Sequence, residues 1–411
     1  MRRSAALLSV LVVWGVACGE SLPVGVARFD GTDVTLPTGD LAPLWRLVGD
    51  ARIIGLGESI HTSGGFLATK QRVIRALIEE RGVRALAMES PRDRARKLDG
   101  YLVSGACDRP AEDVLSEDLF EVFSDDHTYA LMRWICERNA AAPGDPVRLF
   151  GFDIQQPDQD FEELRALLAS AAPADAPALL AGIAGCATDY SIPLLAPAYA
   201  SCLQGLDVLD AWVPAHEAAL VLAAGERTVR LFDIARVSFR AAQDQYFLQP
   251  TDFAASYQPR DLGMGAVFQA VLALDFPADV RVAVWAHNVH LAMHHDQVVD
   301  SPYAPGAITF GTVVARAFGA DYAAVALTGF APGTNWPQID LVTDHTTYGT
   351  ERGSVEVRLH NLGEPYLIVD PRAKLIGPDE QPLNEETVVP ADQFTAIVYL
   401  DSSPPMDAVF W

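Results

Sequence analysis

Two short apolar segments near the start of the chain predict buried strands. Residues 51–57 (ARIIGLG) and 83–89 (VRALAME) are rich in aliphatic side chains, as expected of strands that are covered on both faces of a sheet. Between them, residues 66–81 carry apolar side chains at helical spacing with charged residues in between, and Gly82 follows. This pattern predicts an amphipathic helix that ends at the glycine. A strand, a helix and a strand in succession predict a pair of parallel strands.

Four further segments have the same strand-like composition. They are residues 147–153, 280–286, 322–327 and 365–370. From about 160 to 275 the chain is rich in Ala and Leu and shows no convincing strand pattern, which predicts a helical insertion. We therefore expect an α/β fold with a mostly parallel central sheet, flanked by helices and interrupted by an inserted helical subdomain.

The first residues predict export. Arg2 and Arg3 precede a short apolar stretch and small residues, which is typical of a secretory signal and too short to span a bilayer. Cys18 follows Val-Ala, as in a bacterial lipobox, so we expect a signal peptide over residues 1–17 and a lipid anchor at Cys18. Ordinary cleavage nearby without a lipid is the alternative. Residues 18–38 are then a tether, the domain covers 39–411, and the protein meets the membrane only through its anchor, in the periplasm or cell envelope.

The charge of the chain narrows the choice of partner. The chain has 54 acidic and 30 basic residues and a net charge of -24, with half of its residues hydrophobic. This is the composition of a globular protein, and so acidic a surface repels the phosphate backbone of nucleic acids. We expect no nucleic-acid partner, and cationic or neutral ligands fit better than anionic ones.

The cysteines predict disulfide bonds. Beyond Cys18 the chain has four cysteines, and an even number in an exported protein indicates two disulfides. Of the three possible pairings, we prefer the two between sequence neighbours, Cys107–Cys136 and Cys186–Cys202, and four buried free thiols are the alternative. No CxxC motif is present, so zinc and redox chemistry at the cysteines are disfavoured.

Acidic and basic side chains follow several of the predicted strands. Ligands of open parallel sheets bind beyond the carboxyl ends of the strands, which lie at one edge of the sheet. The residues at these ends are Glu58 and His61, then Glu89, then Asp153, then His287 and His290. Two or more imidazoles and carboxylates at one edge predict a site for acid–base chemistry.

Familiar hydrolase and nucleotide-binding motifs are missing from the sequence. It contains no GxSxG, HExxH, GxxxxGK[ST] or GxGxxG motif. These absences disfavour a serine hydrolase of the α/β-hydrolase type, a common metalloprotease, and the usual nucleotide sites. The simplest remaining mechanism uses water, deprotonated by a histidine whose tautomer is held by a carboxylate.

The sequence resembles the erythromycin esterase family. The stretches that carry the resemblance are GLGESIH at 55–61, RALAME at 84–89, FGFD at 150–153, Arg260-Asp261 with Met264, and WAHNVH at 285–290. The resemblance runs from about residue 35 to the end of the chain, and GExxH with WAHNxH at this separation is fairly specific.

The resemblance implies a hydrolase that cleaves a carboxylic ester or a macrolide-type lactone, in at least some members without a metal. It implies that His61 is the base that activates water and that Glu58 orients it. Glu89 and His287 complete the catalytic group that we predict from it. We further predict that Lys70, His290, Arg260 and Asp153 bind the substrate, and we predict no metal ligand and no cofactor.

Two departures from the family and two alternatives accompany this hypothesis. Gly64-Gly65 stands where family members often carry Arg-Glu, and Lys70 stands where an arginine is expected; lysine keeps the charge but lacks the two-pronged guanidinium. One alternative is a metal-dependent hydrolase. Its ligands would be Glu58, His61, Glu89, His287 and His290. The other is a non-catalytic exported protein that binds a large apolar ligand.

Some of these residues also have plain structural interpretations. Glu58 could cap the helix that follows it, because negative charge is favourable at a helix N-terminus. Glu89 could pair with a nearby arginine such as Arg92. Arg260 and Asp261 could form an ion pair at the surface or between subdomains.

Overall fold

The computed structural model describes residues 21–115, 119–189, 194–298, 306–334, 352–383 and 386–407. The signal peptide expected over residues 1–17 and the anchor expected at Cys18 lie outside the described residues. None of the helices in the described ranges combines the length and the apolar composition that crossing a bilayer requires.

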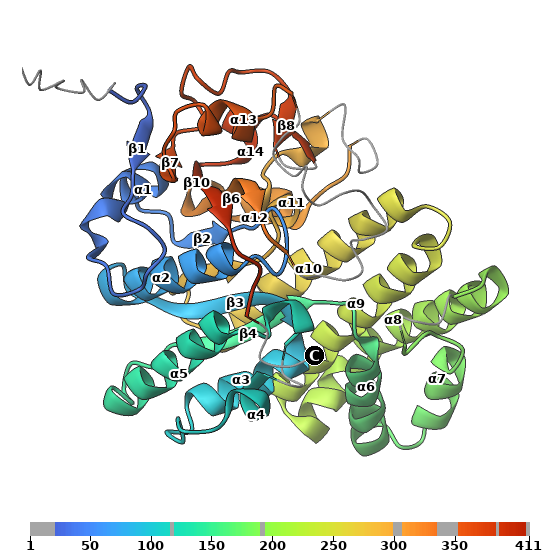
Figure 1. Cartoon of the computed structure of the whole chain (residues 1–411). Helices are drawn as coiled ribbons and strands as arrows, with labels where there is room; N and C mark the ends of the chain where they lie inside the picture. Colours follow the sequence, from blue (N-terminus) through green and yellow to red (C-terminus); the bar gives the residue numbers. More distant parts are fainter. Residues whose placement is uncertain are drawn as a thin grey trace, which may run out of the picture.

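The described residues form a central sheet of eight strands, in the order β1-β7-β10-β6-β2-β5-β3-β4 (Figure 1). The strands are β1 (Val26–Arg28), β2 (Ile53–Leu56), β3 (Val83–Pro91), β4 (Arg148–Asp153), β5 (Arg281–Trp285), β6 (Tyr322–Pro332), β7 (Tyr366–Val369) and β10 (Ala396–Ser403). All neighbouring pairs from β10 to β4 are parallel, while β7 runs antiparallel to both β10 and β1. The expected α/β fold with a mostly parallel sheet is confirmed.

Helices cover both faces of this sheet. Along β5, Ala283 and Trp285 belong to one hydrophobic core, and Val282 and Val284 belong to the other. The first core includes α1 (Ala42–Val48), α2 (Gly64–Glu80), α3 (Arg92–Leu102), α4 (Ala111–Leu115) and α5 (Asp126–Ala141). The second includes α10 (Phe253–Asp275), α12 (Phe310–Phe318) and α13 (Val355–His360). Because both faces are buried, the strands are nearly continuous apolar runs, which is why the sequence pattern revealed them.

Short elements complete the described part of the chain. They are α11 (Asn288–Leu291), α14 (Pro390–Gln393), the strands β8 (Gln381–Leu383) and β9 (Glu386–Val388), and the 3-10 turns η1 (Thr38–Leu41), η2 (Glu121–Phe123), η3 (His295–Gln297) and η4 (Gly319–Asp321).

Helices fill the segment for which we expected a helical insertion. They are α6 (Pro157–Ala171), α7 (Ala176–Ile183), α8 (Ala196–Ala224), α9 (Glu226–Leu248) and α10. Leu164, Leu206 and Phe239 belong to a separate hydrophobic core among α6 to α9, at the lower right of the sheet in Figure 1. Helix α10 packs against α9 and also contributes Met264 and Phe268 to the core on the sheet. It therefore links the helical part to the sheet.

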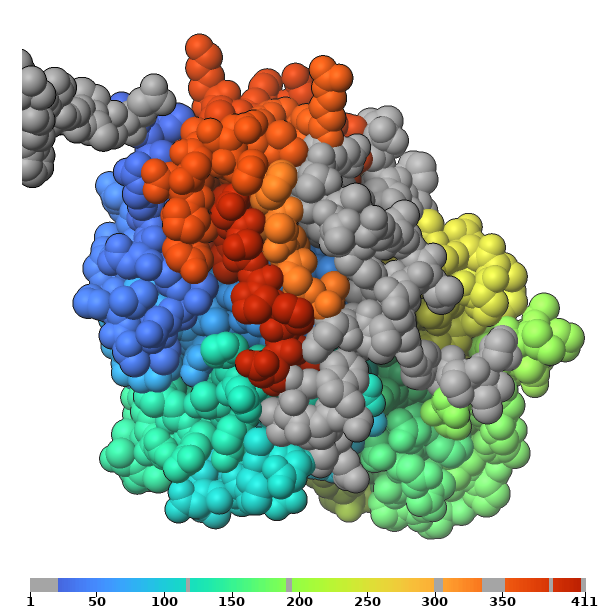
Figure 2. Space-filling view, in the orientation of Figure 1, coloured from blue at the N-terminus to red at the C-terminus, as the bar shows by residue number. Residues whose placement is uncertain are grey.

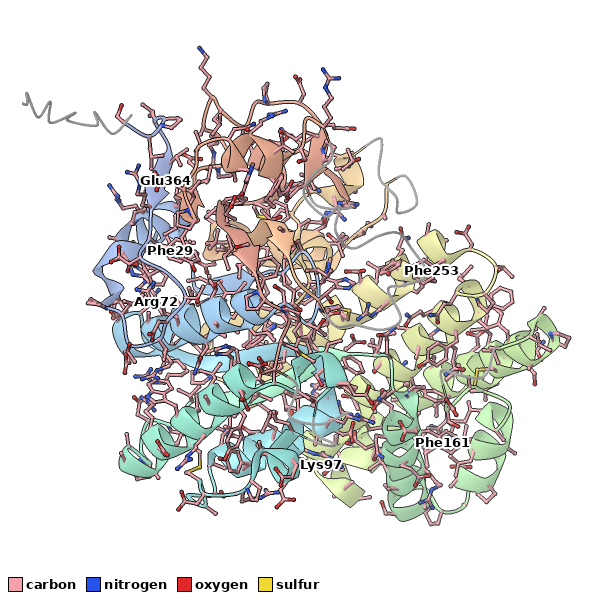
Figure 3. All side chains as sticks on the ribbon, in the orientation of Figure 1. Phe29, Arg72, Lys97, Phe161, Phe253 and Glu364 are labelled. Carbon is pink, nitrogen blue, oxygen red and sulfur yellow. A yellow bond between two sulfur atoms is a disulfide. The ribbon has the colours of Figure 1, made fainter. Side chains whose placement is uncertain are left out.

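The segment expected to be a tether contains an edge strand. Val26–Arg28 pairs with β7, whose edge would otherwise be open. Arg72 of α2 donates hydrogen bonds to the Gly31 carbonyl at 2.8 Å and to Asp40 at 2.7 Å. Phe29 and Arg72 lie on the same side of the molecule in Figure 3. This part of residues 18–38 is thus packed on the domain, which corrects its description as a simple tether.

Two disulfide bonds link the predicted cysteine pairs. Cys107 is bonded to Cys136, with Cα atoms 5.6 Å apart, and Cys186 is bonded to Cys202, with Cα atoms 4.9 Å apart. The preferred pairing is confirmed, and it is compatible with an exported protein.

The order of the strands differs from the sequence-based expectation in one respect. β2 and β3 are parallel, as predicted, but they are not neighbours, because β5 pairs with both of them. The chain reaches β5 only after the helical segment, and the apolar pattern of a strand does not specify its neighbours. This order matters for the site, since it places the ends of β2, β5, β3 and β4 side by side.

Candidate active site

The acidic and basic residues that follow these four strands meet at the carboxyl edge of the sheet. The turn after β2 carries Glu58 and His61, β3 carries Glu89, β4 ends at Asp153, and β5 is followed by His287 and His290. Arg260 and Asp261 reach the same place from α10. The site is thus assembled from the sheet edge and from the helix that joins the sheet to the helical part.

Glu58 is held between a histidine and a lysine. Its Oε1 lies 2.6 Å from His61 Nδ1, and its Oε2 accepts a hydrogen bond from Lys70 Nζ at 2.8 Å. Glu58 and Lys70 are buried, whereas the His61 side chain is 27% exposed. Both carboxylate oxygens are therefore engaged, and the helix-capping interpretation of Glu58 is wrong.

The charges of this group follow from its contacts. Burial would raise the pKa of Glu58, but the Lys70 ammonium and the His61 ring outweigh it and lower the pKa to about 2. Burial lowers the pKa of Lys70 to about 8, against the pull of Glu58. Glu58 is thus an anion at neutral pH and can only accept, so the proton of the neutral His61 ring is on Nδ1. The other ring nitrogen, Nε2, then carries the lone pair of the neutral ring.

His287 lies beside His61. Their ring centroids are 5.1 Å apart, and His287 is also partly exposed. His287 Nε2 is 3.1 Å from the Ser59 carbonyl, which can only accept a hydrogen bond. Burial, together with the neighbouring His61, lowers the pKa of His287 to about 3, so this ring is neutral at physiological pH.

Glu89 and Asp153 share one arginine. Arg260 Nη2 donates to Glu89 Oε1 at 2.7 Å and to Asp153 Oδ2 at 2.5 Å, and all three side chains are buried. The other oxygen of Glu89 accepts the backbone N–H of His287 at 2.8 Å. Burial would raise the pKa of Glu89, but His290 and Arg260 hold it well below its usual range. Glu89 therefore fixes the main chain that carries His287.

His290 is buried in the same network. Its Nδ1 is 2.9 Å from Asp261 Oδ1, and its Nε2 lies 3.1 Å from Arg260 Nη1 and 3.4 Å from Glu89 Oε1. Burial would lower the pKa of His290, but Asp261 and Glu89 outweigh it and raise the pKa. Asp261 also accepts the backbone N–H of Phe310 at 2.7 Å, so it connects His290 to the start of α12.

The structure brings every predicted site residue into this one region, but it separates them into two groups. His61 and His287 are partly exposed, and the other predicted site residues are buried around them. Lys70, Arg260, Asp153 and His290 direct their polar atoms to carboxylates and to each other. Their role in substrate binding stays a prediction, and in this structure they support the Glu58 and Glu89 carboxylates.

Two structural interpretations of these residues are corrected by the contacts. Glu89 pairs with Arg260, whereas Arg92 binds Asp160 at 3.2 Å and also Glu163. Arg260 and Asp261 are not a surface ion pair, because each is buried and bonded to a different site residue.

Other parts of the site were not predicted from the sequence. Asp261 follows Arg260 in the sequence motif, but its contact with His290 could not be predicted. That contact exists only because the fold brings α10 against α11. The Ser59 carbonyl and the Phe123 ring, whose centroid is 6.3 Å from that of His61, carry no sequence signal.

The carboxylates and histidines of this site are not arranged as metal ligands. The oxygens of Glu58 are bonded to His61 and Lys70, and those of Glu89 to Arg260 and the His287 N–H. Across the described residues, no group of three or more His, Cys, Asp or Glu side chains has a geometry that could hold a metal.

The described residues thus form an α/β protein whose histidines and carboxylates meet at the carboxyl edge of a mostly parallel sheet. The chain belongs to the erythromycin esterase family, whose model matches residues 78–403. This match includes Glu89, Asp153, Arg260 and the two histidines after β5; the turn with Glu58 and His61 precedes it.

Solved structures share the fold over nearly the whole chain. A protein from Bacillus cereus matches with a TM-score of 0.74 and 18% identity, covering 94% of this chain and 97% of that one. A mutant of the erythromycin esterase EreC in its open conformation has a TM-score of 0.73 and 19% identity, covering 94% and 100%. A succinoglycan biosynthesis protein has a TM-score of 0.67 and 17% identity, covering 93% and 95%.

One curated relative is similar over a shorter stretch. YbfO of Bacillus subtilis (strain 168), whose name places it provisionally among hydrolases, is 32% identical over 124 residues. These are 30% of this chain, and the chain spans about a quarter (26%) of the length of YbfO. Family membership and this relative together support a hydrolase.

Proposed function

We propose that the protein is a hydrolase that cleaves a carboxylic ester or a macrolide-type lactone with water activated by His61. The contact between His61 Nδ1 and Glu58 Oε1, at 2.6 Å, carries this proposal. It leaves Nε2 as a base on a partly exposed ring, and Lys70 keeps Glu58 ionised behind it. A histidine oriented in this way by a carboxylate is suited to general base catalysis.

The reaction proceeds by addition and elimination at the carbonyl carbon. His61 Nε2 takes one proton from water while the water oxygen bonds to the carbonyl carbon, which gives a tetrahedral oxyanion. The oxyanion then reforms the carbonyl as the carbon–oxygen bond to the alcohol breaks, and protonated His61 returns the proton to the leaving alkoxide. For a lactone, both products stay in one molecule, which gains one water.

The other site residues act on His61 and on the substrate. Glu58 stabilises the imidazolium that forms when His61 is protonated. His287 is partly exposed, and we assign it to the substrate side of the site, next to the reacting carbonyl. Glu89 holds the His287 main chain, and Arg260 holds Glu89. Because both carboxylates are bonded to protein donors, we propose that no metal takes part.

The substrate class follows from the family and from charge. Erythromycin esterase is the name of the family and of the EreC structure with the same fold. A net charge of -24 favours neutral or cationic substrates over anionic ones. We propose a small-molecule ester or lactone as the substrate, and an exported enzyme tethered through a lipid at Cys18.

Replacing the base tests this function. The wild type and His61→Ala are incubated with macrolides and with p-nitrophenyl esters, and mass spectrometry follows the gain of one water. Loss of general base catalysis should lower kcat by about 10²- to 10⁴-fold. His360→Ala is the matched control, because His360 makes a similar pair with Asp401, at 2.7 Å, away from this network. Undiminished turnover by His61→Ala would refute the assignment.

A chelator tests the metal-free mechanism separately. We expect the activity of the purified wild type to be unchanged by dialysis against EDTA. Activity that disappears on dialysis and returns with zinc or manganese would favour the metal-dependent alternative instead.

A further inference from the structure

The residues after β10 lie across the start of α2, just beyond His61. We call residues 403–407, the last residue of β10 and those that follow it, the strap. In Figure 2 the last described residues are the lower part of a continuous red band down the middle of this face. The band reaches the teal region, where the Asp126 N–H contacts the Asp407 carbonyl at 3.4 Å.

The strap supplies the hydrogen bonds that cap α2. The Gly64 N–H donates to the Pro404 carbonyl at 2.9 Å, and the Gly65 N–H donates to Ser403 Oγ at 2.8 Å. The first N–H groups of a helix lack partners within the helix and usually receive them from the N-cap side chain. Ser63, the N-cap residue of α2, makes no such bond, and its hydroxyl lies 2.6 Å from Ser403 Oγ. Ser403 therefore caps α2 from a distant part of the chain.

The strap also accounts for the two glycines that depart from the family pattern. A Cβ atom at Gly64 would lie 2.8 Å from the Pro405 carbonyl oxygen, and one at Gly65 would lie 2.5 Å from Ser403 Oγ and 2.9 Å from its Cβ. Such distances are far below van der Waals contact. An Arg-Glu pair at positions 64 and 65, as the family resemblance would lead one to expect, cannot coexist with the strap in this position.

The same strap holds the turn that carries His61. The Met406 N–H donates to the Thr62 carbonyl at 2.8 Å, and Thr62 has a φ of 63°, a conformation that is unfavourable for a β-branched residue. One residue earlier, Thr334 Oγ1 donates to the His61 carbonyl at 3.2 Å. The Gly333 N–H in turn donates to the Ser403 carbonyl at 2.7 Å. Two successive carbonyls of the turn are thus held in place. Thr334, whose neighbour Gly333 bonds to Ser403, holds that of His61, and Met406 of the strap holds that of Thr62.

We propose that Ser403 is a positioning residue for His61. By capping α2 and anchoring the turn, it keeps the His61 ring on Glu58 and at a constant place in the site. This inference rests on the proposed role of His61 as the base. A base must be held close to its reactive position, so a small displacement of the turn lowers the rate of the chemical step rather than the affinity for the substrate.

Two variants disturb the strap in different ways. Ser403→Ala removes the capping hydroxyl, and Gly65→Ala keeps the hydroxyl but forces the strap away from α2. We expect each to lower kcat by about tenfold with little change in KM, since one buried hydrogen bond and the geometry that depends on it are lost. Ser402→Ala is the matched control, because Ser402 is the exposed neighbour on the same strand, and it should behave as the wild type.

Amide hydrogen exchange gives a readout that does not need activity. In both variants, exchange should become faster in a peptide covering residues 58–66 and stay unchanged in α9. If the wild type hydrolyses no ester or lactone, the proposed function fails, and the exchange result still decides whether Ser403 anchors the turn.

Three results would overturn the proposal. One is that exchange over residues 58–66 is unchanged in Ser403→Ala. Another is that this exchange rises in an active enzyme while kcat stays the same or KM alone changes. The third is that exchange rises equally throughout the protein, which would indicate a general structural role.

Discussion

Lys70 and Glu58 form an ion pair that is almost entirely removed from solvent, with Nζ 2.8 Å from Oε2. The ammonium also lies 4.8 Å from the centroid of the Trp285 ring and 3.4 Å from the Ala286 carbonyl. It therefore binds, inside the protein, the carboxylate oxygen of Glu58 that does not contact His61. A lysine at this position acts on the chemistry by keeping a buried carboxylate charged.

Removing the ammonium should destabilise the protein and slow the reaction together. Lys70→Met leaves Glu58 buried without its cation, and breaking a buried ion pair on one side costs about 3–5 kcal/mol. We expect a loss of this size in the free energy of unfolding, measured with urea, and a fall in kcat. Lys97→Met, which changes an exposed lysine of α3, is the control and should leave both quantities unchanged.

The double variant separates the two effects. In Glu58→Gln/Lys70→Met no charge is left unpaired, so its stability should be closer to that of the wild type than the sum of the single changes predicts. Its activity should stay low, because a neutral amide no longer stabilises protonated His61. Additive losses of stability would show that the two residues do not act as a pair.

The pH dependence of the rate should have an alkaline limb that belongs to Lys70. Its pKa is lowered by burial to about 8, so the ammonium loses its proton as the pH rises through about 8. Glu58 then has no cation beside it, and we expect kcat to decrease above this pH. In Lys70→Arg the charge persists at all accessible pH values, so the limb should move beyond pH 10 or disappear. An alkaline limb at the same pH in both proteins would assign it to another group.

Acid should remove the stability that Glu58 contributes. The Lys70 ammonium and the His61 ring overcome the effect of burial and lower the pKa of Glu58 from 4.5 to about 2. Because the folded-state pKa is depressed, this stability is fully present above pH 4.5 and is lost as the pH falls towards 2. Glu58→Gln should therefore unfold more easily than the wild type at pH 6, and the difference should narrow at pH 3.

An exposed glutamate provides the control for the acid experiment. Glu79→Gln changes a residue near the end of α2 that is open to solvent. Urea unfolding should give this variant the stability of the wild type at both pH values. A difference for Glu58→Gln that is equally large at pH 3 and pH 6 would argue against an ionised Glu58 in the folded protein.

The sequence predicted those features that local patterns encode. Each of the six predicted strands is a run of apolar residues, because its two faces are both buried, and the ends of these runs located Glu58, Glu89, Asp153 and His287. The rule that ligands bind at the carboxyl edge of parallel strands then placed these residues together. The spacing of the half-cystines was enough to prefer the observed disulfides.

Contacts between distant parts of the chain could not be predicted from such local patterns. Nothing in the pattern around β5 shows that it lies between β2 and β3. The strand β10 was missed, and with it Ser403, whose hydroxyl matters only because the fold brings it to the start of α2. Lys70 has the spacing of a residue that faces the site, but its complete burial depends on the packing of α2 against the sheet.

Substitution of Arg260 tests whether α10 contributes to the site. Its guanidinium bonds to both Glu89 and Asp153, so Arg260→Met should remove the bonded guanidinium from two buried carboxylates and cost at least about 3–5 kcal/mol in the free energy of unfolding. Arg260→Lys keeps the charge but cannot make the same set of planar contacts, and it should be intermediate in stability.

The control for Arg260 is an ion pair of the same kind at the surface. Arg227, at the start of α9, pairs with Asp275 at the end of α10, and its side chain is 61% exposed. Arg227→Met should change the free energy of unfolding by less than about 1 kcal/mol, as is usual for exposed pairs. A measurement of activity distinguishes a role of Arg260 in the site from a role in stability alone. Arg260→Lys should have a lower kcat than the wild type even at temperatures where it is fully folded. If Arg260→Lys keeps full kcat, or if Arg260→Met is no less stable than Arg227→Met, the Arg260–Glu89 contact does not support the His287 main chain.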